Sequence, residues 1–247
     1  LLTSPEELGV TPEQIDSQIA VLSAKRPIHK YIAYFQAYTN TYAPVEYLRK
    51  IFTEAIHHPA VVALSIGTRP DCLPEEMLDM LSELNTIKPV TVELGLQTVH
   101  NKTAEKIHRG YNTDVFEKAY KSLTLRGIEV VVHVILGLPG ENIADMLDTI
   151  DYLAELKPVL PGIKLQLLHI LKGTALAAEY SKNHFPIFTM DEYTDLVVEC
   201  IRRLPEETVI HRMTGDGPKS LLIAPEWSGD KKRVLNMLNR KLREAER

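Results

Sequence analysis

Short apolar runs alternate with amphipathic segments along this chain. The runs are rich in β-branched and aromatic residues and are bounded by Gly, Pro or polar positions, which predicts strands. The segments between them place apolar residues every three or four positions, which predicts helices that cover a sheet. The predicted strands are 30–37, 61–67, 90–96, 129–136, 163–171 and 208–213. The predicted helices are 44–57, 74–87, 101–108, 113–126, 142–156, 174–182, 190–203 and 230–244.

The order of these elements predicts the fold. Successive strands begin about 30 residues apart, which is the length that a parallel βαβ crossover needs. Near-continuous apolar strands indicate a parallel sheet with helices on its faces. A chain of 247 residues is short for a full eight-stranded barrel. We therefore predict an α/β fold of the partial TIM type, a (β/α)6 barrel, with a further strand expected upstream of residue 1. A doubly wound sheet is the alternative.

The two ends of the chain are predicted to lie outside the barrel. Ser4-Pro5-Glu6-Glu7 and Thr11-Pro12-Glu13-Gln14 each place a capping residue before Pro and an acid, which predicts peripheral helices within 1–29, the second ending near residue 25. The barrel is assigned to 30–224 and a C-terminal helix to 225–247. Basic and acidic residues interleave in that last segment, so we interpret it as a solvated helix.

Composition narrows the class of protein. Hydrophobic residues make up 45% of the chain and charged residues 25%, as in ordinary globular proteins. A net charge of −5 gives no general attraction for nucleic acid or an anionic membrane. No apolar run is long enough to span a bilayer, and no signal pattern opens the sequence. Two cysteines make no disulfide framework, so we expect a cytoplasmic protein.

Polar and small residues gather where the predicted strands end. In 90–97, Gln97 shares one face with Glu93, opposite three apolar positions. The fourth predicted strand runs into Gly137-Leu138-Pro139-Gly140-Glu141, whose glycines let a ligand approach the backbone. Strand carboxyl ends and helix N-termini are where α/β proteins bind ligands. We therefore expect the ligand site in the stretch 90–141.

Each candidate also has a structural interpretation. Arg109 ends a helix, where its charge favours the helix dipole. His133 lies within an apolar strand, where histidines are more often hydrogen-bonded core residues. Cys72 follows Arg69, which could lower the pKa of its thiol, yet we favour a structural role for it. Cys200 occupies an apolar helical position. The sequence contains no metal-binding spacing such as CxxC or HExxH.

Taken together, the motifs resemble the radical S-adenosylmethionine (SAM) superfamily, in particular a YhcC-like bacterial branch related to Elp3-like and coproporphyrinogen-dehydrogenase-like enzymes. The motifs that carry the resemblance lie at 34–44, 65–73, 92–112, 133–141, 162–174 and 210–216. The resemblance implies a partial (β/α)6 barrel, in agreement with the strand count. It also implies SAM and a [4Fe–4S] cluster as cofactors, with a flavodoxin- or ferredoxin-type electron donor. Reductive cleavage of SAM would give a 5′-deoxyadenosyl radical that takes hydrogen from a substrate.

The resemblance assigns roles to residues of this sequence. It places the SAM amino group on the backbone of Gln36, Ala37 and Tyr38. It places the ribose or methionyl part of SAM at Gln97, the carboxylate at Arg109, a ribose hydrogen bond at His133, and adenine on Gly137, Leu138 and Pro139. The candidates on the substrate side are Arg69, Cys72, Gln166, His169 and Arg212.

The sequence departs from the family pattern in its cysteines. The family holds its cluster through three cysteines in a CxxxCxxC loop, and no such loop occurs here. We expect the loop upstream of residue 1, so no metal ligand is assigned within this sequence. The alternatives are a degenerate barrel that serves as a binding or scaffold protein and a non-radical TIM-like enzyme that acts on a metabolite. The substrate is unassigned, and neither a membrane nor a nucleic-acid partner is indicated.

Overall fold

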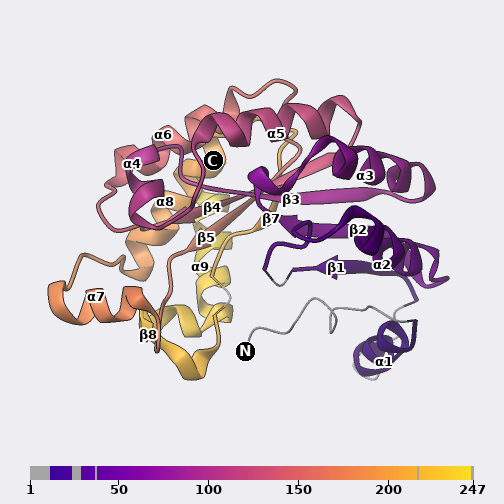
Figure 1. Cartoon of the computed structure of the whole chain (residues 1–247). Helices are drawn as coiled ribbons and strands as arrows, with labels where there is room; N and C mark the ends of the chain where they lie inside the picture. The colour runs from indigo at the N-terminus through magenta and orange to yellow at the C-terminus, as the bar shows by residue number, and fades with distance from the viewer. Residues whose placement is uncertain (1–11, 24–28, 37, 216, 246–247) are drawn as a thin grey trace. The chain divides into compact units, whose positions relative to one another are not determined.

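The computed structural model describes residues 12–23, 29–36, 38–215 and 217–245. A six-stranded sheet has the hydrogen-bonding order β1-β2-β3-β4-β5-β7. Its strands are β1 (Tyr31–Phe35), β2 (Val61–Thr68), β3 (Val90–Gln97), β4 (Glu129–Leu136), β5 (Gly162–Leu167) and β7 (Val209–Arg212) (Figure 1). The pairs β1–β2, β2–β3, β4–β5 and β5–β7 are parallel, as predicted.

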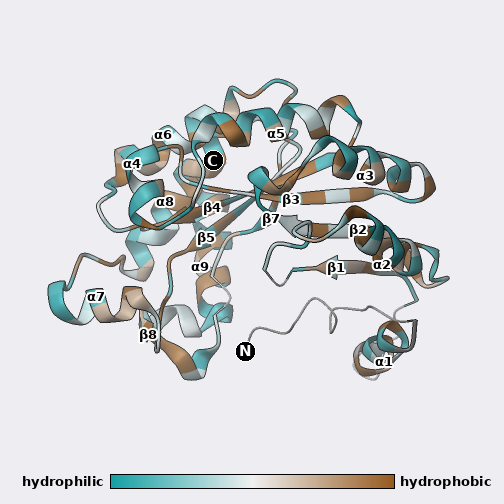
Figure 2. Cartoon of the chain, viewed as in Figure 1, coloured by the Kyte–Doolittle hydropathy of each residue, from teal (hydrophilic) through white to brown (hydrophobic). Residues whose placement is uncertain are grey.

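Helices connect the strands at the predicted places. They are α1 (Pro12–Ser23), α2 (Val45–His57), α3 (Glu75–Ile87), α4 (Asn101–Lys106), α5 (Thr113–Leu125), α6 (Ile143–Ala154), α7 (Ala175–Asn183), α8 (Met190–Arg203) and α9 (Lys231–Ala245). Teal and brown residues alternate along most of them in Figure 2, which is the colouring of amphipathic helices. None of the described helices combines the length and the apolar character that crossing a bilayer requires.

The predicted strand 163–171 is wrong in one respect, because it is two strands. β5 ends at Leu167, and β6 (Ile170–Leu171) pairs antiparallel with β8 (Leu222–Ala224) in a separate sheet. The break falls at Leu168 and His169, whose ring packs against the backbone of a later loop. The sequence did not signal β8 or the short 3-10 helices η2 (Pro70–Cys72), η3 (Lys219–Leu221) and η4 (Glu226–Gly229).

Of the predicted N-terminal helices, the first lies outside the described residues. The second is α1, and its predicted end near residue 25 also lies outside them. His58 Nε2 contacts Asp16 Oδ1 at 3.1 Å and so links α1 to the end of α2.

The chain forms two compact units, which are described separately. The first unit is Leu1–Gly95 with Asp114–Val130, and the second is Leu96–Thr113 with Val131–Arg247. In the first unit, α2 and α3 bury apolar faces, and Phe52, Leu64 and Leu81 are almost fully inaccessible. In the second, Leu165 on β5 and Val197 on α8 are fully buried. The predicted division at residues 30 and 225 stays a prediction.

Candidate functional site

The end of β1 is fastened to β2 in the first unit. Asn40 Nδ2 donates to the carbonyl oxygens of Phe35 at 2.9 Å and Gly67 at 2.8 Å. Tyr38 has a φ of 60°, which is uncommon for a residue with a side chain. Gln36 and Tyr38 are exposed, and Ala37 lies outside the described residues. The predicted contact of these residues with an amino group stays a prediction. Asn40 organises this strand end, and the sequence motifs gave no signal for it.

The loop after β2 sets the surroundings of Cys72. Arg69 donates to both carboxylate oxygens of Asp71, at 2.9 and 2.6 Å. Burial raises the pKa of the Cys72 thiol, Asp71 raises it further, and Arg69 only opposes this increase. Arg69 does lower the pKa of the thiol, as expected, but burial and Asp71 outweigh its effect, so the net shift is upward. Whether Arg69 and Cys72 face a substrate stays a prediction.

A buried carboxylate lies on the inner face of β3. Glu93 is 6% exposed and accepts hydrogen bonds from Tyr34 Oη at 2.7 Å and Ser65 Oγ at 2.9 Å. The apolar positions of the opposite face, Val92, Leu94 and Leu96, are fully buried. The strand period therefore predicted the two faces of β3 correctly, but it gave no signal for the contribution of Tyr34.

The residue that ends β3, Gln97, is the centre of a strained turn in the second unit. Its φ is 62°, and the N–H of Thr98 donates to the carbonyl of Leu96 at 2.8 Å. A hydrogen bond from residue i+2 to residue i around a positive φ defines the rarer of the two γ-turns. Backbone strain of this kind costs about 1–3 kcal/mol and persists where the surrounding structure enforces it.

Arg109 holds this turn from both sides. Its Nη1 atom donates to Leu96 O at 2.7 Å and to Thr98 O at 2.6 Å. Nε donates to Tyr111 O at 2.9 Å, and Nη2 to Asn101 Oδ1 at 3.2 Å and to a Thr113 hydroxyl at 3.4 Å. All the guanidinium donors thus have protein partners. The predicted bond to a ligand carboxylate stays a prediction, and it requires Arg109 to exchange one of these bonds.

The end of α4 explains how Arg109 comes to point back at β3. The N–H of Arg109 donates to Ala104 O, and the N–H of His108 donates to Glu105 O. This pair of bonds is a Schellman motif, with His108 in the left-handed conformation at a φ of 54°. Glycine normally occupies that position, so the sequence gave no signal for the motif. Burial lowers the pKa of Arg109, and Tyr111 opposes this shift.

Two residues that were predicted for different roles are neighbours on β4 and β5. Gln166 Nε2 lies 3.0 Å from His133 Nδ1, and both side chains are half-buried. Arg212 on β7 is the register partner of Lys164 on β5. The structure thus brings His133 and Gln166 together, while their contacts with a ligand stay predictions.

The glycine-containing loop after β4 borders a cavity. The cavity has a volume of ≈ 710 Å3 and is lined by residues 137–143, Met146, residues 185–188 and Glu192. Gly137 has a φ of 92°, and a Cβ there would lie 3.4 Å from the Phe188 ring. Leu138 and Pro139 are buried and line the cavity. This volume lies within the range of small-molecule pockets.

One hydrogen bond joins the Gln97 turn to this loop. Thr98 Oγ1 donates to Glu141 Oε1 at 2.6 Å. Burial raises the pKa of Glu141, and the hydroxyl bonds from Thr98 and Thr103 oppose the increase. The ends of β3 and β4, which the sequence predicted to form one ligand site, are therefore connected through these two residues.

The raised pKa of Glu141 predicts a pH dependence. Because the pKa is higher in the folded state, the carboxyl contributes most to stability below its unfolded pKa, and this contribution is lost as the pH rises through the folded value. Glu141→Gln cannot ionise and still accepts from Thr98. The free energy of unfolding of Glu141→Gln minus that of wild type should therefore be higher at pH 7 than at pH 4. Urea unfolding of both proteins at the two pH values measures this difference.

The control for this experiment is Glu192→Gln at the N-terminus of α8. Hydrogen bonds from the backbone and the hydroxyl of Thr189 lower the pKa of Glu192. Its contribution is present above the unfolded pKa and is lost as the pH falls, so this variant should lose more stability at pH 7 than at pH 4. If the stability difference between variant and wild type changes in the same direction with pH for both variants, the opposite pKa shifts assigned to Glu141 and Glu192 are contradicted.

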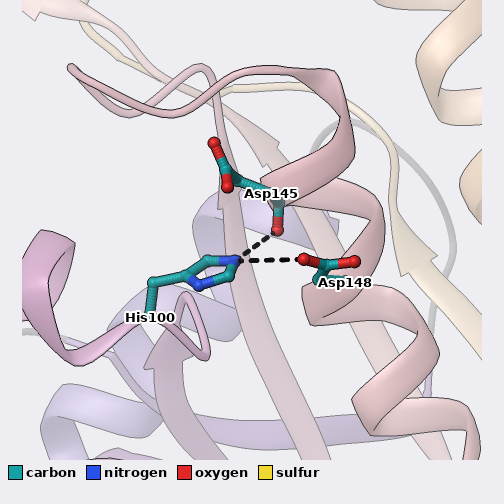
Figure 3. Close-up of side chains that lie close together, drawn as sticks. All are labelled: His100, Asp145 and Asp148. Atoms are coloured by element: carbon teal, nitrogen blue, oxygen red, sulfur yellow. Dashed lines mark hydrogen bonds and ion pairs between the residues drawn. The ribbon is translucent and has the colours of Figure 1, made fainter.

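A cluster of His100, Asp145 and Asp148 has the composition of a metal site, but protein contacts account for it. His100 Nε2 lies 2.9 Å from the backbone carbonyl oxygen of Asp145 and 4.0 Å from Asp148 Oδ2. In Figure 3 the Asp145 carboxylate points away from the ring, and it accepts from the N–H of Asn142 in a capping box. The cluster therefore links the start of α4 to the first turn of α6, and we assign no metal to it.

His169, which was predicted on the substrate side, lies between two glycines. The N–H of Gly217 donates to His169 Nδ1 at 3.2 Å. A Cβ on Gly215 would lie 2.4 Å from ring atoms of His169. The imidazole is therefore packed against loop backbone, and a contact with a substrate stays a prediction.

The chain matches two protein-family models and several known proteins. The model of the radical SAM superfamily matches residues 4–153, and the model of the radical SAM C-terminal domain matches residues 160–244. YtqA of Bacillus subtilis is 45% identical over 213 residues, which are 86% of this chain and 66% of YtqA. YhcC of Escherichia coli is 38% identical over 216 residues, which are 87% of this chain and 69% of YhcC.

A solved structure shows the same fold. The structure of Methanocaldococcus infernus Elp3 with an N-terminal deletion matches with a TM-score of 0.78 at 20% identity, over 97% of this chain and 61% of that one. This match confirms the predicted α/β fold of the partial TIM type. The chain spans about two thirds of the length of the two curated relatives.

Proposed function

The chain belongs to the radical SAM superfamily, and from this premise we propose that it binds SAM in the second unit, where β3 and β4 end. The observation that carries the proposal is the bond from Thr98 to Glu141. This bond connects the strained turn at Gln97 to the glycine loop and its cavity. The parent activity that we propose is reductive cleavage of SAM to a 5′-deoxyadenosyl radical, which acts on a substrate.

The residues of the second unit fit SAM. The cavity of ≈ 710 Å3 is lined by Gly137, Met146 and Phe188, a largely apolar wall that suits adenine. The positive φ of Gly137 keeps a side chain out of this wall. Gln97 offers amide groups that can bond to ribose or carboxylate oxygens. SAM bound here would supply the radical once an electron is delivered, and the residues of this chain would orient it and exclude water.

The cysteines of the chain do not fit a [4Fe–4S] cluster. Thiolates hold such clusters, and the chain has two cysteines. Burial raises the pKa of Cys200 to about 12 and raises that of Cys72. Both thiols are therefore held in the protonated form, and no step of our proposal uses them. A flavodoxin- or ferredoxin-type electron donor belongs to the same proposal.

Calorimetry with SAM on wild type, Gly137→Ala and Gly173→Ala tests the site. Gly137 and Gly173 have similar positive φ values, 92° and 81°, but a Cβ on Gly173 meets nothing within 4 Å. Both variants therefore introduce the same backbone strain, and only Gly137→Ala narrows the cavity. We expect Gly137→Ala to weaken SAM binding by about tenfold or more, the scale of a misplaced ligand contact, and Gly173→Ala to leave it unchanged.

Two results would contradict the proposal. One is the absence of SAM binding to wild type. The other is an equal loss of SAM affinity in Gly137→Ala and Gly173→Ala. Binding of a sugar phosphate in place of SAM would favour the non-radical TIM-like enzyme instead.

A further inference from the structure

We infer that Tyr111 and Arg109 are positioning residues that present the side-chain amide nitrogen of Gln97 to the ligand. The inference rests on the proposed SAM site and adds to it the orientation of one contact. It makes Tyr111, to which the sequence analysis assigned no role, part of the site.

The backbone of Gln97 is held by Arg109. The two carbonyls that flank Gln97, those of Leu96 and Thr98, both accept from Arg109 Nη1, at 2.7 and 2.6 Å. A γ-turn with positive φ is strained for any residue with a side chain. A buried cation that bridges the carbonyls on both sides favours this strained form over an extended strand end. Arg109 is 6% exposed, so water competes little for these bonds.

The side chain of Gln97 is held by Tyr111. Tyr111 Oη donates to Gln97 Oε1 at 3.4 Å. Arg109 in turn fixes Tyr111, because its Nε atom donates to Tyr111 O at 2.9 Å and its Cζ atom lies 4.9 Å from the centre of the Tyr111 ring. Arg109 therefore supports the backbone at Gln97 directly, and it supports the Gln97 side-chain amide indirectly, through Tyr111.

This contact favours one orientation of the amide toward a ligand. With Oε1 engaged by the phenol, the Gln97 NH2 group is the end that remains, and among the described residues it has no hydrogen-bond partner. Gln97 is half-buried, so a ligand can reach it. An NH2 group only donates, so Gln97 should select an oxygen acceptor, such as a carboxylate or a ribose hydroxyl, and should not bind an ammonium group.

Calorimetry with SAM on three variants tests this orientation. Tyr111→Phe removes the phenol, so SAM binding should weaken by about threefold to tenfold, the scale of one hydrogen bond. Gln97→Glu keeps an acceptor for Tyr111 but removes the donor, so it should weaken binding by about tenfold or more. Gln97→Gly relieves the positive φ and removes the amide, so it should raise the melting temperature while it weakens binding.

The opposite result for Gln97→Glu is informative. If this variant binds SAM as well as wild type or more tightly, the amide oxygen faces the ligand and the inference is overturned. Equal affinity of Tyr111→Phe and wild type would also overturn it. A purely structural role would lower the melting temperature of Tyr111→Phe and leave its SAM affinity unchanged.

A second measurement needs no ligand and separates this inference from the proposed function. The 15N heteronuclear NOE of the Gln97 side-chain amide should indicate a rigid group in wild type and a mobile one in Tyr111→Phe. If wild type fails to bind SAM but this difference is seen, the proposed function fails and the positioning of Gln97 by Tyr111 stands. If the amide is equally mobile in both proteins, the positioning role is overturned whatever the binding result.

Discussion

Arg109→Ala is expected to lower the free energy of unfolding by about 3–4 kcal/mol, because it removes several hydrogen bonds to buried and half-buried carbonyl oxygens. The carbonyls of Leu96, Thr98 and Tyr111 each lose a hydrogen bond from the guanidinium. A carbonyl left without a donor costs about 1–3 kcal/mol when it stays dry; the Leu96 carbonyl keeps the bond from the Thr98 N–H, and partial entry of water reduces the sum further. Urea unfolding at neutral pH measures the effect.

The matched control is Arg126→Ala. Arg126 bonds Glu75 and Asp79 on the surface of the first unit, and both carboxylates are largely exposed. Exposed ion pairs contribute little because water and salt screen them, so Arg126→Ala should lose much less stability than Arg109→Ala. The loss of stability in Arg109→Lys should lie between the losses in Arg109→Ala and Arg126→Ala, because an ammonium group cannot reproduce the planar set of donors. A loss of less than about 1 kcal/mol for Arg109→Ala would show that water replaces the guanidinium at this turn.

The arrangement of elements was predictable because hydrophobic periodicity is a local property. Glu129–Leu136 was predicted as a strand and is β4, and Val90–Gln97 differs from its prediction by a single residue. The apolar run 163–171 was misjudged because Leu and Ile suit one long strand as well as two short ones. At the break, His169 packs against the distant loop at Gly215, a contact that no local pattern contains.

The candidate site was predictable in its members but not in their arrangement. Gln97 and Arg109 were both singled out, yet their relation depends on a positive φ at Gln97 and another at His108. Neither residue type signals a left-handed backbone as glycine does. The contribution of Tyr111 follows from that arrangement. The upward shift of the Cys72 pKa was not foreseen for a related reason, since burial and the adjacent Asp71 outweigh the effect of Arg69.

Gly215→Ala is expected to lower the free energy of unfolding by about 2–3 kcal/mol, through overpacking against His169. An added Cβ would lie 2.4 Å from Cε1 and Nε2 of the imidazole, closer than packed atoms can approach. Gly215 is buried, so the loop has little room to move outward. The ring is also held by the N–H of Gly217 at 3.2 Å, so it cannot rotate away without losing that bond. Urea unfolding measures the loss.

A double-mutant cycle attributes this loss to the ring. In the His169→Ala background the imidazole is gone, so Gly215→Ala should cost less than half of its value in wild type, because contacting residues are not additive. Gly229→Ala is the control, since its Cβ would meet Leu222 at 3.7 Å, an ordinary contact, and should cost about 1 kcal/mol or less. If Gly215→Ala costs the same with and without His169, the penalty comes from the loop backbone and the ring does not shape this loop. If the cycle shows strong coupling, the loop around Gly215 adopts its path because it packs against the imidazole, which would make His169 a structural anchor before any role toward a substrate.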